Sequence, residues 1–193
     1  FSIDDTEGTF YVNWWFPRNE SVSGSNKLIR VWPQDDEAGG IVSWTTMHLT
    51  RSRDTDHDCV RDVAGVPNWR EFGGTANLWS NLEIIVQNSD VECGHGQITA
   101  YSDNAVTHDN VDFWASGPIK RIRLIGYDPS SPEDNSNVIA DWTDVYVDTT
   151  LARVVVCNSE VMAAGSHSEI QVPTGWNSNQ ITVSVNRGSF SPS

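Results

Sequence analysis

The chain has 193 residues, of which 26 are acidic and 12 are basic, so its formal net charge at pH 7 is −14. A charge of this sign repels phosphate backbones and anionic lipid surfaces, and we therefore expect no nucleic-acid partner. No apolar run approaches the roughly 18 residues that a membrane-spanning helix needs, so we expect no membrane insertion. The first residue is Phe1 and no signal peptide is visible, which favours an exported protein given as a mature form or a fragment.

Strand patterns begin near the N-terminus. Residues 10–16 (FYVNWWF) carry aromatic side chains on both faces, which is typical of a strand covered on both sides in a two-layer structure. Residues 27–34 and 41–50 predict the next two strands. Residues 51–74 lose this periodicity and gain Asp, Arg, Gly and Pro, which indicates a long loop.

The second half repeats short strands between clusters of Gly, Pro, Asn and Asp. These strands are expected at residues 82–87, 97–103, 119–127, 142–148 and 151–157. No long amphipathic run has caps at both ends, so no helix of more than two turns is expected. The spacing predicts an all-β fold, an antiparallel sandwich.

The composition changes after residue 163, where two short strands, residues 169–172 and 180–186, are predicted among Gly, Ser and Pro. A strand pair is marginally stable by itself, so this segment must either pack on the sandwich or pair with a strand from elsewhere. We divide the chain into a sandwich domain, residues 1–157, and a C-terminal strand appendage, residues 158–193.

Three cysteines are present. Cys59 and Cys93 lie in polar, turn-rich segments, where a disulfide between two loops is one interpretation and two free thiols the other. Cys157 ends an apolar strand and would remain as a buried small hydrophobe or as an intermolecular link. No C-x-x-C pair exists, which excludes a zinc ribbon or a thioredoxin-like site.

A family resemblance lies in the order of the segments WWF, IRVW, NLEIIV, GQITAY, IKRIRLIGY and DWTDVYVDTTLARV. Over residues 8–156 this order resembles the concanavalin A-like jelly rolls of secreted polysaccharide-binding and polysaccharide-cleaving proteins. The resemblance implies a jelly roll, an extracellular location and a polysaccharide or glycan partner. The E-x-D-x-E strand of retaining glycosidases is missing, as are the R-x-E-x-R, Q-x-H and Y-x-K-x-G-x-Y strands of alginate-lyase-like members. The activity therefore stays open.

Glycans bind such sandwiches where aromatic rings meet sugar faces and polar groups take the hydroxyls. The candidates for ligand binding are Arg30, Trp32, Trp44, Glu83 and Tyr101, and the candidates for catalysis are His48, Tyr101, Arg30 and Gln87. In a lyase, His48 or Tyr101 would act as base and acid, Arg30 would neutralise a uronate carboxylate, and Gln87 would assist. The alternative is structural: the tryptophans and His48 belong to the core, and Glu83 and Gln87 face solvent.

Asp141 and Asp144, helped by acidic residues of the N-terminal segment, could bind a structural calcium ion, since this cation prefers several carboxylate and carbonyl oxygens. The alternative is a solvated acidic surface. Three functions follow in order of preference: a carbohydrate-binding protein, a polysaccharide lyase or hydrolase, and a structural subunit of an extracellular assembly. The last would self-assemble through the C-terminal strands, whose open edge could pair with a neighbouring copy.

Overall fold

A computed structural model of the chain describes most of the predicted strands. The described residues are 9–17, 27–33, 41–44, 48–51, 70–71, 78–87, 95–114, 119–124, 141–165, 167–188 and 190. Within them the chain forms antiparallel β-strands and a single turn of 3-10 helix, η1 (Met162–Ala164). This confirms the all-β, antiparallel fold class. Of the predicted loop 51–74, only residues 51, 70 and 71 belong to the described part.

The first sheet has five strands in the order β10-β1-β6-β7-β8. Their bounds are β1 (Thr9–Pro17), β6 (Trp79–Gln87), β7 (His95–Ser102), β8 (Ala105–Trp114) and β10 (Thr143–Asp148). β1 and β6 pair along their whole length, from Thr9 opposite Gln87 to Pro17 opposite Trp79. Sequence patterns missed β8.

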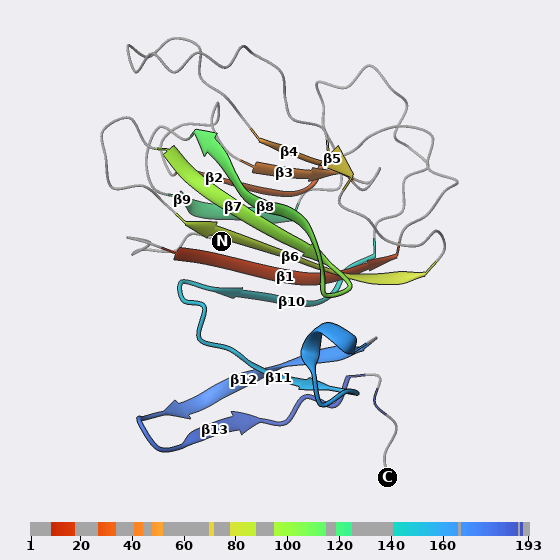
Figure 1. Cartoon of the computed structure of the whole chain (residues 1–193). Coiled ribbons are helices and arrows are strands. Elements are labelled where there is room, and N and C mark those ends of the chain that lie inside the picture. The colour runs from red at the N-terminus through yellow and green to blue at the C-terminus, as the bar shows by residue number, and fades with distance from the viewer. Residues whose placement is uncertain are drawn as a thin grey trace.

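The second sheet also has five strands, in the order β5-β4-β3-β2-β9. Their bounds are β2 (Lys27–Pro33), β3 (Ile41–Trp44), β4 (His48–Arg51), β5 (Arg70–Glu71) and β9 (Ile119–Leu124). The single strand predicted at 41–50 is in fact two strands, because Ile41 of β3 pairs with Arg51 of β4. The two five-stranded sheets stack as the layers of a sandwich (Figure 1).

The core lies between these two layers and consists of apolar side chains, which in β1, β6 and β7 occupy alternate positions. Its buried members are Phe10, Val12, Trp14, Phe16, Leu28, Ile29, Val31, Leu82, Ile84, Val86, Ile98, Ala100 and Ile122. Trp14 and Leu82 lie opposite each other in the β1–β6 register and are both fully buried. Each fully buried side chain of this size contributes roughly 1.5–3 kcal/mol, so β1 and β6 supply much of the stabilisation.

A third sheet of three strands follows, in the order β11-β12-β13. Its strands are β11 (Val154–Cys157), β12 (Ser168–Trp176) and β13 (Ile181–Ser184). β11 falls within the segment assigned to the sandwich domain, yet it pairs with β12, with Val154 opposite Gln171. The chain therefore leaves the sandwich after β10.

The Cys157 thiol is free and partly buried, whereas Cys59 and Cys93 lie outside the described residues.

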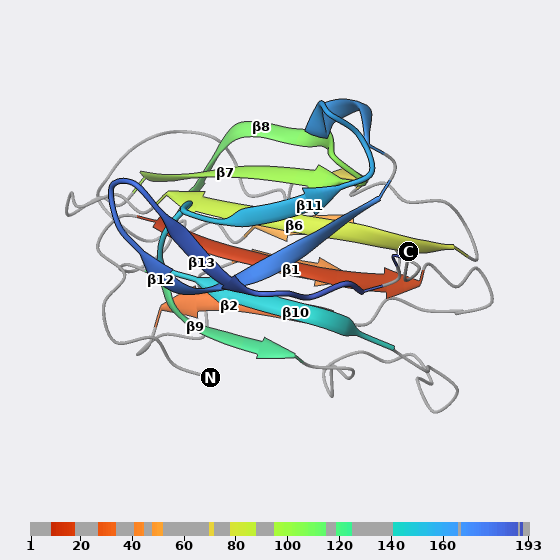
Figure 2. The ribbon, with the colours of Figure 1, turned by 90° about the horizontal axis from the view of Figure 1, so that it is seen from below.

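The C-terminal sheet lies across the outer face of the first sheet, over β1, β6 and β10 (Figures 1 and 2). The side chains of β1 and β6 that point away from the core are therefore covered as well. Tyr11, Asn13 and Glu83 are 0%, 2% and 3% exposed although they lie on this outer face. The C-terminal segment therefore packs on the sandwich, and its self-assembly with a neighbouring copy stays a prediction.

Candidate functional site

A polar cluster joins the C-terminal segment to the middle of the first sheet. Tyr11 Oη donates a 2.7 Å hydrogen bond to Glu83 Oε2, and Arg153 Nη2 donates a 3.1 Å bond to the same oxygen. The guanidinium carbon of Arg153 lies 4.6 Å from the centre of the Tyr11 ring. Two donors and an aromatic face thus compensate the burial of one carboxylate and one guanidinium.

A second tyrosine extends this cluster toward β10. The ring centre of Tyr146 lies 6.0 Å from that of Tyr11 in an edge-on arrangement, and Tyr146 Oη donates a 2.6 Å hydrogen bond to Asp148 Oδ2. Burial and the nearby Glu83 carboxylate raise the pKa of Tyr11 well above its ordinary value. Burial and the hydrogen bond to Asp148 raise the pKa of Tyr146 to about 12. Both phenols are held protonated, which suits anchoring more than proton transfer near neutral pH.

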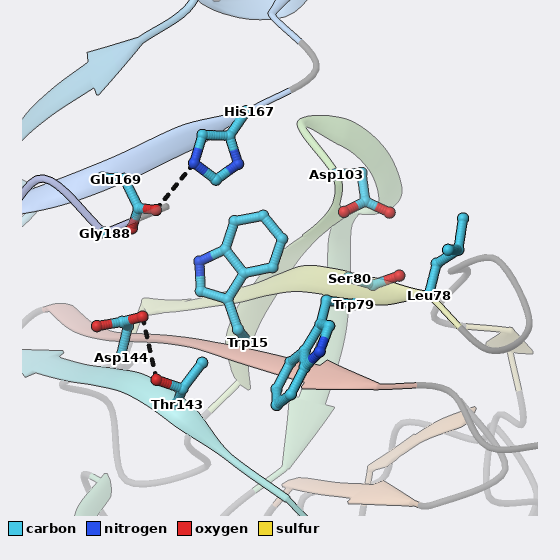
Figure 3. Close-up of a pocket in the computed structure, with 10 residues that line it drawn as sticks. All are labelled: Trp15, Leu78, Trp79, Ser80, Asp103, Thr143, Asp144, His167, Glu169 and Gly188. Atoms are coloured by element: carbon cyan, nitrogen blue, oxygen red, sulfur yellow. Dashed lines mark hydrogen bonds and ion pairs between the residues drawn. The ribbon is translucent and has the colours of Figure 1, made fainter. Parts of the chain in front are cut away.

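Beside the cluster, a cavity of about 540 Å³ opens between the end of the first sheet and the C-terminal sheet (Figure 3). Its lining comes from both parts of the molecule. The residues that line it are Trp15, Leu78, Trp79, Ser80, Asp103, Thr143, Asp144, His167, Glu169 and Gly188. We call this cavity the inter-sheet pocket.

Two tryptophans form the apolar wall of the inter-sheet pocket. Trp15 pairs with Asn81 and Trp79 pairs with Pro17, so the two residues occupy diagonal positions in the β1–β6 register. The Trp15 indole points toward His167, whereas the Trp79 indole points away from it (Figure 3). Trp79 is 49% exposed and Trp15 is partly buried. An indole that remains accessible inside a concave site is available to a ligand.

The opposite wall comes from the start of β12. His167 Nε2 lies 2.8 Å from Glu169 Oε1, and the His167 ring packs at 5.5 Å from the Trp15 ring and at 4.6 Å from the Phe190 ring. Gly188 has a φ of +48°, and a Cβ there would collide with the Glu169 carboxylate. The close approach of this backbone to Glu169 therefore requires glycine.

Two exposed carboxylates complete the rim, each on a residue with positive φ. Asp103 (φ 50°) and Asn104 (φ 64°) form the two-residue turn between β7 and β8, as in a type I′ hairpin. Asp144 (φ 51°) lies in a bulge of β10, where the pairing slips between Asn13 and Trp15. A bulge redirects its side chain, and here Asp144 joins the inter-sheet pocket.

The predicted ligand-binding residues are divided between the two layers. Glu83 and Tyr101 lie opposite each other in the first sheet and share its outer face, where Glu83 is engaged by Tyr11 and Arg153. Arg30 belongs to the second sheet, opposite Arg123, and alternates with the buried Ile29 and Val31, so it points away from the core on the other side of the sandwich. The structure therefore does not bring Arg30 together with Glu83 and Tyr101.

The remaining candidate residues lie apart from Glu83 and Tyr101. Gln87 is exposed at the end of β6. The backbones of Trp32, Trp44 and His48 belong to β2, β3 and β4 of the second sheet, and their side chains lie outside the described part of the chain. Trp44 pairs with Lys27, and His48 pairs with Glu71.

Asp141 and Asp144 are both exposed. Asp144 Oδ2 accepts a 3.2 Å hydrogen bond from Thr143 Oγ1. Among the described residues, no three His, Cys, Asp or Glu side chains cluster as a metal site would require. The acidic residues expected to help lie in the N-terminal segment, outside the described residues, so the calcium site stays a prediction.

The inter-sheet pocket combines residues that sequence patterns did not group. Trp15, Trp79 and His167 come from three distant segments that meet because the C-terminal sheet folds back. One sequence signal for this pocket was present: the Asp103-Asn104 pair, whose residue types favour a left-handed turn.

The chain matches no protein-family model, and no curated protein matches it significantly. No helix among the described residues is long and apolar enough to span a membrane.

Proposed function

We propose that this protein binds carbohydrate in the inter-sheet pocket. The observation that carries the proposal is the pairing of two accessible indoles, Trp15 and Trp79, with the exposed carboxylates of Asp103 and Asp144 around one cavity. Indole faces pack against the apolar faces of sugar rings, and carboxylate oxygens accept hydrogen bonds from hydroxyl groups. The volume of about 540 Å³ falls within the range of small-ligand pockets.

The same proposal includes an extracellular jelly roll. Two antiparallel five-stranded sheets stacked around one core are the layers that such a fold requires. The resemblance of residues 8–156 to secreted concanavalin A-like proteins supports the location and the polysaccharide partner. Catalysis of the lyase type has less support, because Arg30 and His48 belong to the second sheet whereas Gln87 and Tyr101 belong to the first.

A second candidate function is assembly through the C-terminal sheet. Trp176 and Ile181 face each other across β12 and β13 and are 49% and 43% exposed, and Val172 and Val185 are exposed nearby. Within the described residues β11 and β13 are the edges of this sheet. Exposed apolar side chains beside an open edge favour strand pairing with another chain.

Depletion of the protein from solution by insoluble neutral, amino and uronate polysaccharides tests the first function. Trp79→Ala should weaken binding about tenfold, since it removes one aromatic wall. Trp176→Ala is the matched control, because Trp176 has the same exposed fraction as Trp79 but does not line the pocket. If no polysaccharide depletes the protein, or if both variants behave alike, the pocket is not a carbohydrate site. Light scattering of wild type and Trp176→Ala tests assembly separately.

A further inference from the structure

The inter-sheet pocket has an uneven charge. Among the described residues that line it, three are acidic, Asp103, Asp144 and Glu169, and none is Lys or Arg. Glu169 is 3% exposed and is engaged by His167, so it belongs to the wall. Asp103 and Asp144 are exposed and remain accessible to a ligand.

Both rim carboxylates are held in place by neighbours. The Asn81 backbone N–H donates a 2.8 Å hydrogen bond to Asp103 Oδ1, and the Thr143 hydroxyl donates a 3.2 Å bond to Asp144 Oδ2. Each carboxylate is therefore already restricted in the free protein, so it loses less conformational entropy when a ligand binds. Figure 3 shows Asp103 and Asp144 on opposite sides of the Trp15 indole, while the Trp79 indole points away from His167.

Indole faces and carboxylates both attract cations. The face of an indole is negative and attracts a cation, and a carboxylate does the same more strongly. A neutral sugar uses only the apolar and hydrogen-bonding properties of such a pocket. A uronate would bring its carboxylate between Asp103 and Asp144, where like charges repel, and the net charge of −14 adds to that cost.

We infer that the inter-sheet pocket selects an amino sugar, a glycan that carries free protonated amino groups, with Asp103 and Asp144 as specificity-determining residues. This inference rests on the proposed carbohydrate-binding function. The sugar ring packs on Trp79 and Trp15, and its ammonium group lies within reach of a rim carboxylate. The pocket thus distinguishes a free amine from its acetylated form, which has the same ring but no charge.

Calorimetric titration of the whole chain with four soluble probes tests this selection. The probes are oligomers of glucosamine, of N-acetylglucosamine and of galacturonate, together with oligolysine as a cation without a sugar. The titrations are run at a slightly acidic pH that keeps the amines protonated. We expect glucosamine oligomers to bind about tenfold more tightly than the N-acetylated ones, as two partly exposed ion pairs would give, and galacturonate not to bind.

The double variant Asp103→Asn, Asp144→Asn removes the charge and little else. Asparagine tolerates the left-handed backbone of both positions, and its amide oxygen can still accept the bonds from Asn81 and Thr143. We expect this variant to lose the preference for the free amine while its affinity for N-acetylated oligomers changes less than about twofold. Asp109→Asn, an exposed aspartate of β8 outside the pocket, should behave as wild type.

The outcomes separate this inference from the function on which it rests. Equal affinity for free and acetylated oligomers, both lost in Trp79→Ala, would leave the carbohydrate site intact and overturn the amine selection. Tight binding of oligolysine that persists in Trp79→Ala would show simple charge attraction, which also overturns it. If no oligosaccharide binds at all, the carbohydrate function itself fails.

Discussion

The Arg153 guanidinium lies 3.1 Å from the Glu83 carboxylate, which connects the segment after β10 to the centre of β6. The side chains of Arg153 and Glu83 are 20% and 4% exposed, so the pair lies largely out of water. Since β11 follows immediately after Arg153, this contact fixes where the C-terminal sheet begins to cross the sandwich. The inter-sheet pocket depends on that position.

Arg153→Ala should therefore loosen the C-terminal sheet. It leaves the Glu83 carboxylate buried without its counter-charge, which costs about 3 kcal/mol for pairs of this kind. Urea unfolding measures the loss of stability. Relative to wild type, amide hydrogen exchange in the variant should accelerate more in β12 than in β6, because the sandwich core is unchanged.

A double-mutant cycle provides the control. Glu83→Gln keeps an oxygen that can accept the Tyr11 hydrogen bond while removing the charge. Combined with Arg153→Ala, it should be less destabilising than Arg153→Ala alone, because no buried charge is left unpaired. Strictly additive losses would show that the two side chains do not interact energetically.

Alkaline pH should destabilise the protein through its two outer-face tyrosines. A tyrosine in the unfolded chain ionises at about pH 10. In the folded protein, burial raises the pKa of Tyr11 above this value and raises the pKa of Tyr146 to about 12. The folded state then binds more protons than the unfolded state, so the free energy of unfolding falls as pH rises above about 10 and is unaffected by these groups below it.

Tyr11→Phe isolates this effect. Phenylalanine does not ionise, so the decline in stability above about pH 10 should become shallower by up to about 1.4 kcal/mol per pH unit. At neutral pH the variant should lose about 1.5–3 kcal/mol, the contribution of a hydrogen bond to a charged group. Urea midpoints measured across the alkaline range check both. An unchanged slope would mean that Tyr11 ionises normally.

Gly188→Ala should disturb the wall of the inter-sheet pocket. The new methyl would meet the Glu169 carboxylate on a backbone with a φ of +48°, and moving Glu169 would break its contact with His167. We expect a loss of about 1–3 kcal/mol in stability. Gly175→Ala is the control, since its Cβ would meet Thr182 Cβ at an ordinary 3.6 Å and should cost little. Equal losses would contradict this account of Gly188.

Local patterns predicted the sandwich better than the site. The aromatic side chains on both faces of residues 10–16 indicated a strand covered on both sides, and β1 is covered by the second sheet on one face and by the C-terminal sheet on the other. Strand β8 was missed because its middle, with Asp109 and Asn110, has residues that are rare in strands, and Asn110 has a φ of 45°.

The pocket could not be read from the sequence for a different reason. Trp15 and His167 are far apart in the chain, and only the fold-back of β12 over β1 brings their rings within 5.5 Å. The sequence predicts Asp144 as a possible metal ligand, which stays a prediction. A bulge, which has no residue pattern of its own here, brings Asp144 to the pocket. Alternation along a strand predicts which face a residue shares, not what covers that face.

The most direct measurement of the central claim is a two-dimensional NMR spectrum of the indole N–H groups. The chain has nine tryptophans, and Trp79→Phe, Trp15→Phe and Trp176→Phe assign the three that matter. On titration with short glucosamine and N-acetylglucosamine oligomers, a carbohydrate site in the inter-sheet pocket predicts that the Trp15 and Trp79 signals shift while the Trp176 signal does not. Shifts confined to other tryptophans, or none with either sugar, would contradict it.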